Sequence, residues 1–404
     1  MRDLPASGES RLFTDMDIAF CYESVLPARG GCEIYIADLA RRMVAEGHRV
    51  HLYACRWDQS ALPTSLHYHP IPNSRGPRFL RPWRFSASCA HALCDRKHDV
   101  SVGFNKTWGQ DVLYPLAGLH AASAEHNIRK HRRPMVRALA RAVKSLDLAH
   151  WSFSRLERRQ YLGKRRPLVV VNSRLVRSHF QTYYGFSENE LRVVHNAIDP
   201  ARFEESDRLR RRSEARERWG IGANDVVGLL VAMNYHLKGL EPLLHAVARL
   251  PGPSRFQLLV AGNPRTGNYE RLARRLRIAD RVRFAGYVAQ TRDCYFAADF
   301  LVHPTFYDPC SLVVLEALAC GLPVITSRYN GASELLTPPE DGYVLDDPHD
   351  DRALAHCLEH MLDSKRRLAQ GQAARHKSAQ WTFDDHFRKL LIVFNEAAVC
   401  KNAA

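Results

Sequence analysis

The sequence lacks any apolar segment long enough to cross a membrane. Even the run from Val226 to Met233 is short and contains Gly228, whereas a spanning helix needs roughly 18 uncharged apolar residues. Residues 1–15 carry several charges and have no apolar core of the kind that a secretory signal requires. We therefore expect a cytoplasmic protein whose contact with a membrane, if any, is peripheral, and we expect residues 1–15 to form a disordered extension.

The sequence also lacks C-x-x-C pairs, although it contains ten cysteines. Scattered cysteines are typical of a reducing compartment, and they provide no closed set of metal ligands. The dinucleotide-binding pattern G-x-G-x-x-G is absent too, which argues against an oxidoreductase. We expect no metal site and no cofactor.

Acidic residues are outnumbered by basic ones, which gives a formal net charge of +15 over 404 residues. Such a charge indicates an anionic partner: nucleic acid, anionic lipid or a phosphorylated substrate. No RNA-recognition signature, zinc spacing or aromatic-basic interleaving is present, so we expect no nucleic-acid partner. The hydrophobic fraction of 46% is typical of a globular protein with cores for two domains.

Short apolar strands alternate with amphipathic helices along the whole chain. The predicted strands of the first half are 17–21, 49–54, 98–103, 168–171 and 191–195, and those of the second half are 226–233, 256–261, 282–284, 300–303 and 323–325. Strands that are joined by helices lie parallel in one sheet. The sequence therefore predicts an α/β protein with two Rossmann-like, doubly wound domains, 16–200 and 201–380, and a helix at 381–404 that folds back over the first domain.

Gly30 and Gly31 stand between the first strand and the helix predicted at 33–46. Backbone N–H groups at a helix N-terminus attract anions, and glycine lets a diphosphate approach the backbone. A plain strand-to-helix turn would explain the two glycines equally well, and the residues alone leave both interpretations open.

The most informative segment is 306–325, which reads FYDPCSLVVLEALACGLPVI. Asp308 precedes a predicted helix whose first N–H groups, at Ser311 and Leu312, are available to phosphate oxygens. Glu316 lies two turns further on among apolar residues, where a carboxylate needs a hydrogen-bonding partner such as the hydroxyls of a ribose.

This segment resembles the signature of glycosyltransferase family 4, in which an acidic residue, seven further residues and a glutamate precede Gly-x-Pro-Val. The likeness extends from about Asp17 to the C-terminal helix, through the Gly30-Gly31 loop and the segments 194–199, 237–240, 260–263, 284–288 and 331–335. Segments 102–106 and 109–112 resemble the lipopolysaccharide core heptose glucosyltransferases within that family.

The resemblance implies a GT-B fold, with a cleft between the two domains, and a role for each matching residue. Asp308 would contact hydroxyls of the donor sugar. His120 would contact the transferred sugar, with His126 as a competitor for that role. The donor-binding residues would be Glu316 for the ribose, the Ser311 and Leu312 amides with Lys238 for the diphosphate, Gly30 and Gly31 for the phosphates from the other domain, and the loop ending at Val288 for the base.

Two positions depart from the family pattern. Asp308 is one methylene shorter than the usual glutamate, which leaves a hydrogen-bond acceptor but makes the identity of the donor less secure. The phosphate-binding arginine that commonly precedes the lysine is missing, and Met233 and Asn234 occupy that region. Either Lys238 carries this charge alone or Arg265 assists it.

A basic segment without an intervening acid contains Arg129, Lys130, Arg132, Arg133, Arg137, Arg141 and Lys144. Apolar residues recur at helical spacing within it, which predicts one basic amphipathic helix. Such a helix suits an anionic inner leaflet or a phosphate-decorated acceptor. An ordinary domain helix, with its apolar stripe against the core, would show the same pattern.

Taken with the resemblance, these features lead us to expect a retaining hexosyltransferase at the inner face of the cytoplasmic membrane. Its donor would be a nucleotide-diphosphate sugar, with a UDP-sugar favoured, and its acceptor a cell-envelope glycan such as lipopolysaccharide core. The alternatives are transfer to another glycan or glycolipid, and a GT-B sugar-nucleotide epimerase that performs no transfer.

Overall fold

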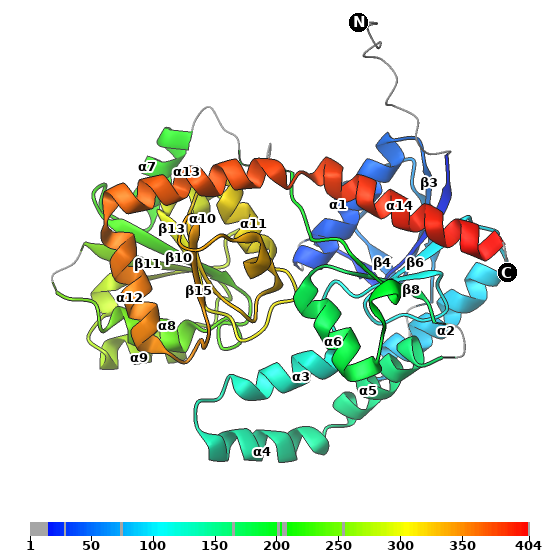
Figure 1. The fold of residues 1–404 in the computed structure, drawn as a ribbon, viewed down its shortest axis with the longest axis horizontal. Coiled ribbons are helices and arrows are strands. Elements are labelled where there is room, and N and C mark those ends of the chain that lie inside the picture. Colours follow the sequence, from blue (N-terminus) through cyan, green and yellow to red (C-terminus); the bar gives the residue numbers. More distant parts are fainter. Residues whose placement is uncertain are drawn as a thin grey trace, which may run out of the picture.

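The computed structural model describes residues 15–27, 30–72, 76–163, 166–199, 203, 208–252 and 255–402. It has two lobes, each built on a parallel sheet with helices on its faces (Figure 1). The expected N-terminal extension, apart from Asp15, lies outside the described residues. Within the described residues, no helix combines the length and the apolar character that crossing a membrane requires.

The first lobe contains a seven-stranded sheet in the order β5-β3-β1-β6-β7-β8-β9, and all its pairs are parallel. Most of its strand residues are buried, as expected for a parallel sheet that is covered on both faces. The strands are β1 Asp17–Cys21, β3 Arg49–Ala54, β5 His67–Pro70, β6 Val100–Phe104, β7 Val112–Tyr114, β8 Leu168–Val171 and β9 Leu191–Val193, while β2 Ser24–Val25 and β4 Arg56–Trp57 form a separate pair.

The helices of the first lobe are α1 Gly31–Ala45, α2 Arg81–Cys94, α3 His120–Arg129, α4 Pro134–Ser145, α5 Leu148–Tyr161 and α6 Arg174–Tyr184. The predicted basic amphipathic helix is present as α4, and the basic residues before it lie at the end of α3 and in the turn between the two helices, because α3 ends at Arg129 and α4 begins at Pro134. A proline lacks the N–H that would continue the first helix, and its fixed φ suits the first position of a new one.

The second lobe contains a six-stranded parallel sheet in the order β12-β11-β10-β13-β14-β15. Its strands are β10 Val226–Ala232, β11 Phe256–Gly262, β12 Val282–Gly286, β13 Phe300–His303, β14 Val324–Ser327 and β15 Gly342–Leu345. Its helices are α7 Arg208–Arg218, α8 Leu240–Val247, α9 Gly267–Arg275, α10 Arg292–Ala297, α11 Leu312–Ala319, α12 Asp351–Leu362 and α13 Ser364–Gln380. The two doubly wound sheets confirm the predicted fold class.

The chain returns to the first lobe at its end. Figure 1 shows α13 lying along the second lobe and α14, Phe383–Asn402, continuing over the first. Phe387, Leu390 and Phe394 of α14 are buried in the same apolar cluster as Phe20 of β1 and Val102 of β6. The last helix therefore completes the core of the first lobe.

Each sheet has one point at which the strand order reverses, and ligands of such folds bind beyond the carboxyl ends of the strands at that point. In the first lobe this point lies between β1 and β6, and in the second between β10 and β13. The loops that follow these four strands are therefore where a site is expected.

Candidate functional site

The two loops at the second lobe's reversal point are fastened to each other. Phe306 N–H donates to the Leu237 carbonyl at 2.9 Å, and the Thr305 hydroxyl donates to the same oxygen at 3.2 Å. Gly239 has φ +77°, and a Cβ there would lie 2.1 Å from the Pro304 carbonyl oxygen, so only glycine allows this approach. The loop after β10 is thereby held against the loop after β13.

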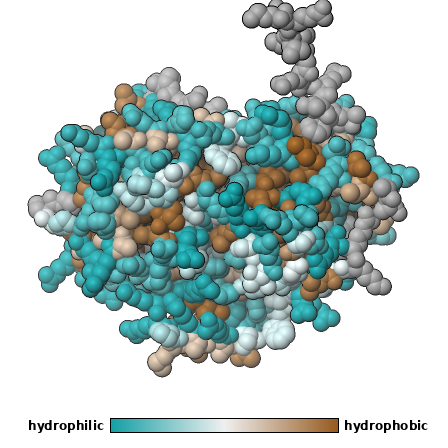
Figure 2. All heavy atoms as spheres, in the orientation of Figure 1, coloured by the Kyte–Doolittle hydropathy of each residue, from teal (hydrophilic) through white to brown (hydrophobic). Residues whose placement is uncertain are grey.

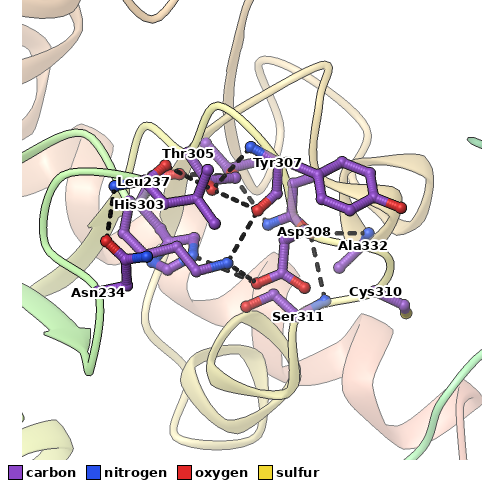
Figure 3. A network of polar contacts seen from close by, with 12 residues as sticks. Asn234, Leu237, His303, Thr305, Tyr307, Asp308, Cys310, Ser311 and Ala332 are labelled. Atoms are coloured by element: carbon purple, nitrogen blue, oxygen red, sulfur yellow. Dashed lines mark hydrogen bonds and ion pairs between the residues drawn. The ribbon is translucent and has the colours of Figure 1, made fainter. Parts of the chain in front are cut away.

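This contact places Lys238 beside Asp308, in the polar network around Thr305, Tyr307 and Asp308 that Figure 3 shows. Lys238 Nζ lies 2.6 Å from Asp308 Oδ2 and donates to the Tyr307 carbonyl at 3.0 Å. Both side chains are mostly buried. An ammonium group has three donors, so one N–H of Lys238 is left for a further oxygen. Lys238 and Asp308, for which the resemblance implies contacts to the diphosphate and to the donor sugar respectively, thus form one ion pair.

The charge of Asp308 is fixed by its neighbours. Burial acts to raise the pKa of this carboxyl, but the ammonium of Lys238 and a contact with His303 hold it well below its usual range. His303 Nε2 lies 3.6 Å from Asp308 Oδ2, and burial lowers the pKa of this histidine. Asp308 is therefore a carboxylate at neutral pH, able to accept hydrogen bonds from sugar hydroxyls and unable to donate a proton.

The start of α11 is partly occupied, which corrects the expectation for Ser311. Its N–H donates to Asn330 Oδ1 at 3.2 Å, and the same oxygen accepts from Ala332 N–H at 3.1 Å. Asn330 is fully buried after β14, and its Nδ2 donates to Thr326 Oγ1. The Ser311 amide is thus tied to the loop after β14, whereas Leu312 is the first residue of α11, where N–H groups have no partner within the helix.

Glu316 lies in α11 as predicted and is half-buried. The hydroxyl of Tyr295, which is fully buried in α10, donates to Glu316 Oε2. Tyr295 therefore fixes the orientation of this carboxylate. Because the two residues are far apart along the chain, the sequence pattern around Glu316 did not reveal this partner.

Two helix N-termini meet between the lobes. Gly31 is the first residue of α1, and a Cβ on it would lie 3.0 Å from Leu312 Cδ1 at the start of α11. The next residue, Cys32, has a pKa raised to about 12 by burial, with the charge of Asp308 among the lesser causes. The glycine pair of one lobe thus faces the Asp308 segment of the other, and both ends carry the positive pole of a helix dipole.

The two candidate histidines differ in what they contact. His120 begins α3, and its Nε2 lies 3.0 Å from His150 Nδ1 of α5. His126 is buried and stacks on Tyr307, with ring centroids 4.9 Å apart. Burial is the main cause that lowers the pKa of His120 to about 3 and that of His126 to about 4. Both imidazoles are neutral, and His126 is the one that packs against the Asp308 loop.

The end of the site that would receive the base shows two further features. Val288 follows β12 and is half-buried against the second lobe's core, whereas Tyr287 is largely exposed. Asn263 links the missing-arginine position to Arg265, because its Nδ2 donates to the Met233 carbonyl and its Oδ1 accepts from Arg265 N–H. Arg265 is exposed beside the segment where the family arginine would stand.

The basic residues of segment 129–144 differ in whether they contact other side chains or carbonyl groups. Arg129 pairs with Glu125 at 2.5 Å, and Arg132 lies 3.7 Å from Asp351 of the second lobe. Arg137 donates to the His131 carbonyl. Within the part of the chain that the structure describes, no ion pair engages Lys130, Arg133 or Arg141.

None of the residues of α4 is buried. Its apolar residues and those that follow are exposed to solvent, with Met135 85%, Leu139 64%, Leu146 82% and Trp151 64% exposed. α4 lies at the lower edge of the molecule, where apolar colours appear on the surface (Figures 1 and 2). The interpretation of α4 as a helix with its apolar stripe against the core therefore does not hold.

Four residues near the site were not singled out from the sequence: Tyr295, His303, Tyr307 and Asn330. Only His303 carries a sequence signal, since it ends a predicted strand at the edge where ligands bind. As for metals, the described ranges contain no group of three or more His, Cys, Asp or Glu side chains that could hold an ion.

Comparison with known families matches both lobes. Residues 29–202 match the model of "Glycosyltransferase Family 4", and residues 211–377 match that of "Glycosyl transferases group 1". The chain is 30% identical over 356 residues to a probable transglycosylase of Burkholderia thailandensis, covering 86% of this chain and 88% of the relative.

Lipopolysaccharide glucosyltransferase WaaG of Escherichia coli strain K12 is 25% identical over 365 residues, covering 89% of this chain and 94% of the relative. A crystal structure of WaaG, a glycosyltransferase involved in lipopolysaccharide biosynthesis, superimposes with a TM-score of 0.76 at 23% identity, covering 93% of this chain and 99% of the other. The structure of Anabaena HepE in complex with UDP-glucose gives a TM-score of 0.65 at 17% identity, covering 96% and 99%. These likenesses show the same two-lobed fold.

Proposed function

The chain is a glycosyltransferase of family 4, and from that premise we propose that it moves a hexosyl group from a UDP-sugar to a cell-envelope glycan such as lipopolysaccharide core. The observation that carries the proposal is the meeting of the α1 and α11 N-termini beside the Lys238–Asp308 pair. The lipopolysaccharide substrate of WaaG and the UDP-glucose bound by HepE support the choice of acceptor and donor.

We place the donor's diphosphate beside the two facing helix N-termini. Amides at Gly31 and Leu312 approach it from opposite lobes, and Lys238 offers its remaining N–H to one phosphate oxygen. Glu316, oriented by Tyr295, accepts the hydroxyls of the ribose, and the loop at Val288 receives the base. These groups stabilise the negative charge that develops on the departing diphosphate. We propose that they do so without a metal ion or cofactor.

The transferred sugar lies between Asp308 and the start of α3. The Asp308 carboxylate accepts hydrogen bonds from its hydroxyls, and neutral His120 contacts it from the first lobe. We retain His120 for this role because His126 is already stacked against Tyr307 and buried. The bond to the acceptor forms on the face that the diphosphate leaves, and a diphosphate oxygen takes the acceptor's proton, so the anomeric configuration is retained.

The test uses the purified full chain with a panel of sugar nucleotides, with and without membrane extract. We expect release of UDP from one donor only when extract is present, unchanged by EDTA, and loss of that release in Asp308→Ala and Glu316→Ala. Nuclear magnetic resonance of the product should show the donor's anomeric configuration. Interconversion of a sugar nucleotide without transfer would support an epimerase, and no binding of any nucleotide would refute the proposal.

We further propose that α4 rests on the anionic inner leaflet of the cytoplasmic membrane. Its exposed apolar residues would enter the headgroup region, while Arg133, Arg137 and Arg141 meet the phosphates. Basic residues near such a surface contribute about 1 kcal/mol each. The apolar and basic residues belong to one helix with no buried residue, and this supports the proposal.

Cosedimentation with vesicles tests this contact. We expect binding to vesicles that contain about 30% phosphatidylglycerol, and much weaker binding to neutral phosphatidylcholine vesicles. Leu139→Glu with Val143→Glu should abolish binding, whereas Leu368→Glu, at an exposed apolar residue of α13, should leave it unchanged. Equal binding by the α4 variant would contradict the proposal.

A further inference from the structure

The first lobe holds a cavity at its own reversal point. It has a volume of about 550 Å³ and lies beyond the carboxyl ends of β1 and β6, where it is lined by Tyr22 and Glu23 after β1 and by Asn105 and Lys106 after β6. A cavity at this position and of this size is typical of a ligand site in a doubly wound fold. None of the donor contacts proposed above uses it.

Basic side chains surround this cavity. Arg56, Arg78, Arg81 and Lys106 line it, together with the carboxylates of Glu23 and Glu33. Across the described ranges no ion pair joins any of the four cations to a carboxylate. Four cations against two carboxylates leave an excess of two positive charges, which matches the charge of a phosphomonoester at neutral pH.

The loop that carries Lys106 is held rigidly. Gln160 of α5 donates to the Asn105 and Thr107 carbonyls at 2.6 and 2.7 Å, and Ser86 of α2 donates to the Lys106 carbonyl at 3.1 Å. Asn105 has φ +58°, a conformation that most residues avoid and that recurs at functional sites. Its Oδ1 accepts from Ala117 N–H, which fixes the loop to the segment before α3.

A helix N-terminus adds to the positive field. Arg81 and Pro82 line the cavity and begin α2, a helix of 14 residues without a side-chain cap at its start. Pro82 has no N–H, but the N–H groups of Arg81 and Trp83 have no partner within the helix, so they favour an anion at this end. Lys106 is half-buried with its Nζ 3.7 Å from the centre of the Phe153 ring, and burial is the main cause that lowers its pKa. A bound anion would compensate for the hydration that this ammonium loses on burial.

We propose that this cavity binds a phosphomonoester on the acceptor glycan. The inference rests on the proposed function and specifies its acceptor as a phosphorylated sugar. Glu33, which lines the cavity, and Gly31, which meets Leu312 of the second lobe, belong to the same first turn of α1. A sugar bound in this cavity therefore lies against the same turn of α1 that faces the second lobe, and Glu23 can accept its hydroxyls.

The first arm of the test measures binding without transfer. Inorganic phosphate is titrated calorimetrically into full-length protein that is saturated with UDP, so that the diphosphate site is filled. We expect saturable binding by the wild type and by Arg84→Ala, which changes a residue of α2 outside the cavity lining, and binding weaker by roughly tenfold or more in Arg78→Ala/Arg81→Ala. Equal binding by the double variant, or loss of binding when UDP is present, would overturn the proposal.

The second arm uses the acceptor itself. A membrane glycolipid extract is divided, one half is treated with alkaline phosphatase, which removes phosphomonoesters and leaves lipid phosphodiesters, and transfer to both halves is compared. We expect transfer to fall by roughly tenfold or more after treatment, and the double variant to lose the preference. Equal transfer to both halves would refute the proposal. If no transfer occurs in any arm while phosphate still binds, the proposed function fails and the phosphate site stands.

Discussion

At the residue scale, Asp308 and Lys238 act as one unit. The carboxyl pKa lies well below that of an unfolded aspartate, so its contribution to folding stability is complete above pH of about 4 and is lost only as the pH falls further. The Asp308 carboxylate is therefore ionised over the whole range in which activity would be measured. Any loss of activity between pH 8 and 5 must come from other groups.

Replacing Asp308 by asparagine separates the two tasks of this unit. We expect transfer to fall by roughly 100-fold, because the charged acceptor for the sugar hydroxyls is gone. Binding of UDP, measured by calorimetry, should not weaken, because Lys238 is then free for the diphosphate. Lys238→Ala, by contrast, should weaken UDP binding, because it removes the cation proposed to contact the diphosphate. Weaker UDP binding in Asp308→Asn with transfer retained would contradict these assignments.

Arg265 is expected to replace the arginine that this chain lacks. It stands beside Met233 through the shared contacts of Asn263. Arg265→Ala should weaken UDP binding by roughly tenfold, the effect of removing one charge-assisted contact to a phosphate. Arg274→Ala, at an exposed residue of the neighbouring helix α9, serves as the matched control. Equal affinities in the two variants would leave Lys238 as the sole cation for the diphosphate.

At the element scale, the start of α3 is held by a buried carboxylate. Glu157 of α5 accepts from the N–H groups of His120 and Ala121 and from the Tyr184 hydroxyl, while burial raises its pKa. Glu157→Gln replaces one accepting carboxylate oxygen by an NH2 group, which cannot accept a hydrogen bond from the N–H and O–H groups that face it. We expect a loss of about 1–2 kcal/mol in the free energy of unfolding, read from urea denaturation.

The same variant tests whether Glu157 positions His120. We expect kcat to fall while KM for the donor changes little, since the donor's nucleotide lies on the other lobe. Glu125→Gln, at a half-exposed residue of α3 that does not contact His120 N–H, is the control. A kcat equal to that of the wild type, despite the loss of stability, would show that the capping is only structural.

The edge of the first sheet predicts acid sensitivity. His51 Nδ1 of β3 lies 2.9 Å from His69 Nε2 of β5, and His51 Nε2 lies 3.3 Å from Asp17 Oδ1. The Tyr53 hydroxyl lies 2.8 Å from His98 Nε2. Burial is the main cause that lowers the pKa of His69 and of His98 to about 4. The neutral forms are thus favoured by folding, and their contribution is complete above pH of about 6.5 and is lost as the pH falls toward 4.

We therefore expect the melting temperature to fall between pH 7 and 5, with a smaller slope in His69→Gln than in the wild type. Arg96 and Lys401 also face this cluster and add to the repulsion when the histidines become charged. His376→Gln, at an exposed position of α13, is the control. A slope that is the same in both variants would rule out the cluster as its source.

At the scale of the whole molecule, Glu334 joins the lobes. Its two carboxylate oxygens accept from Arg174 and Leu175 N–H at the start of α6, and one of them lies 2.9 Å from His195 Nε2. Glu334→Ala removes these contacts at once. We expect a larger radius of gyration by small-angle scattering and slower transfer, because the facing helix N-termini separate. Glu340→Ala is the exposed control on the same lobe, and an unchanged radius of gyration would contradict the prediction.

Features that depend on neighbouring residues along the chain could be predicted from the sequence, whereas contacts between segments far apart along the chain could not. Strands such as 17–21 and 300–303 were predicted because their apolar runs are local signals. The occupation of the Ser311 amide could not be predicted, because Asn330 reaches it from another loop. The start of α4 at Pro134 had a local signal, because proline suits the first position of a helix. Roles of the site residues follow from the family likeness and stay predictions.

The return of α14 to the first lobe also sets an order for folding during synthesis. Domains generally fold from the N-terminus as they emerge from the ribosome. Here the apolar surface around Phe20 and Val102 remains uncovered until Phe387, Leu390 and Phe394 have been made, after the entire second lobe. The nascent chain therefore exposes part of the first lobe's apolar core while the second lobe is being made, and we expect products that end before α14 to be less soluble than the full chain.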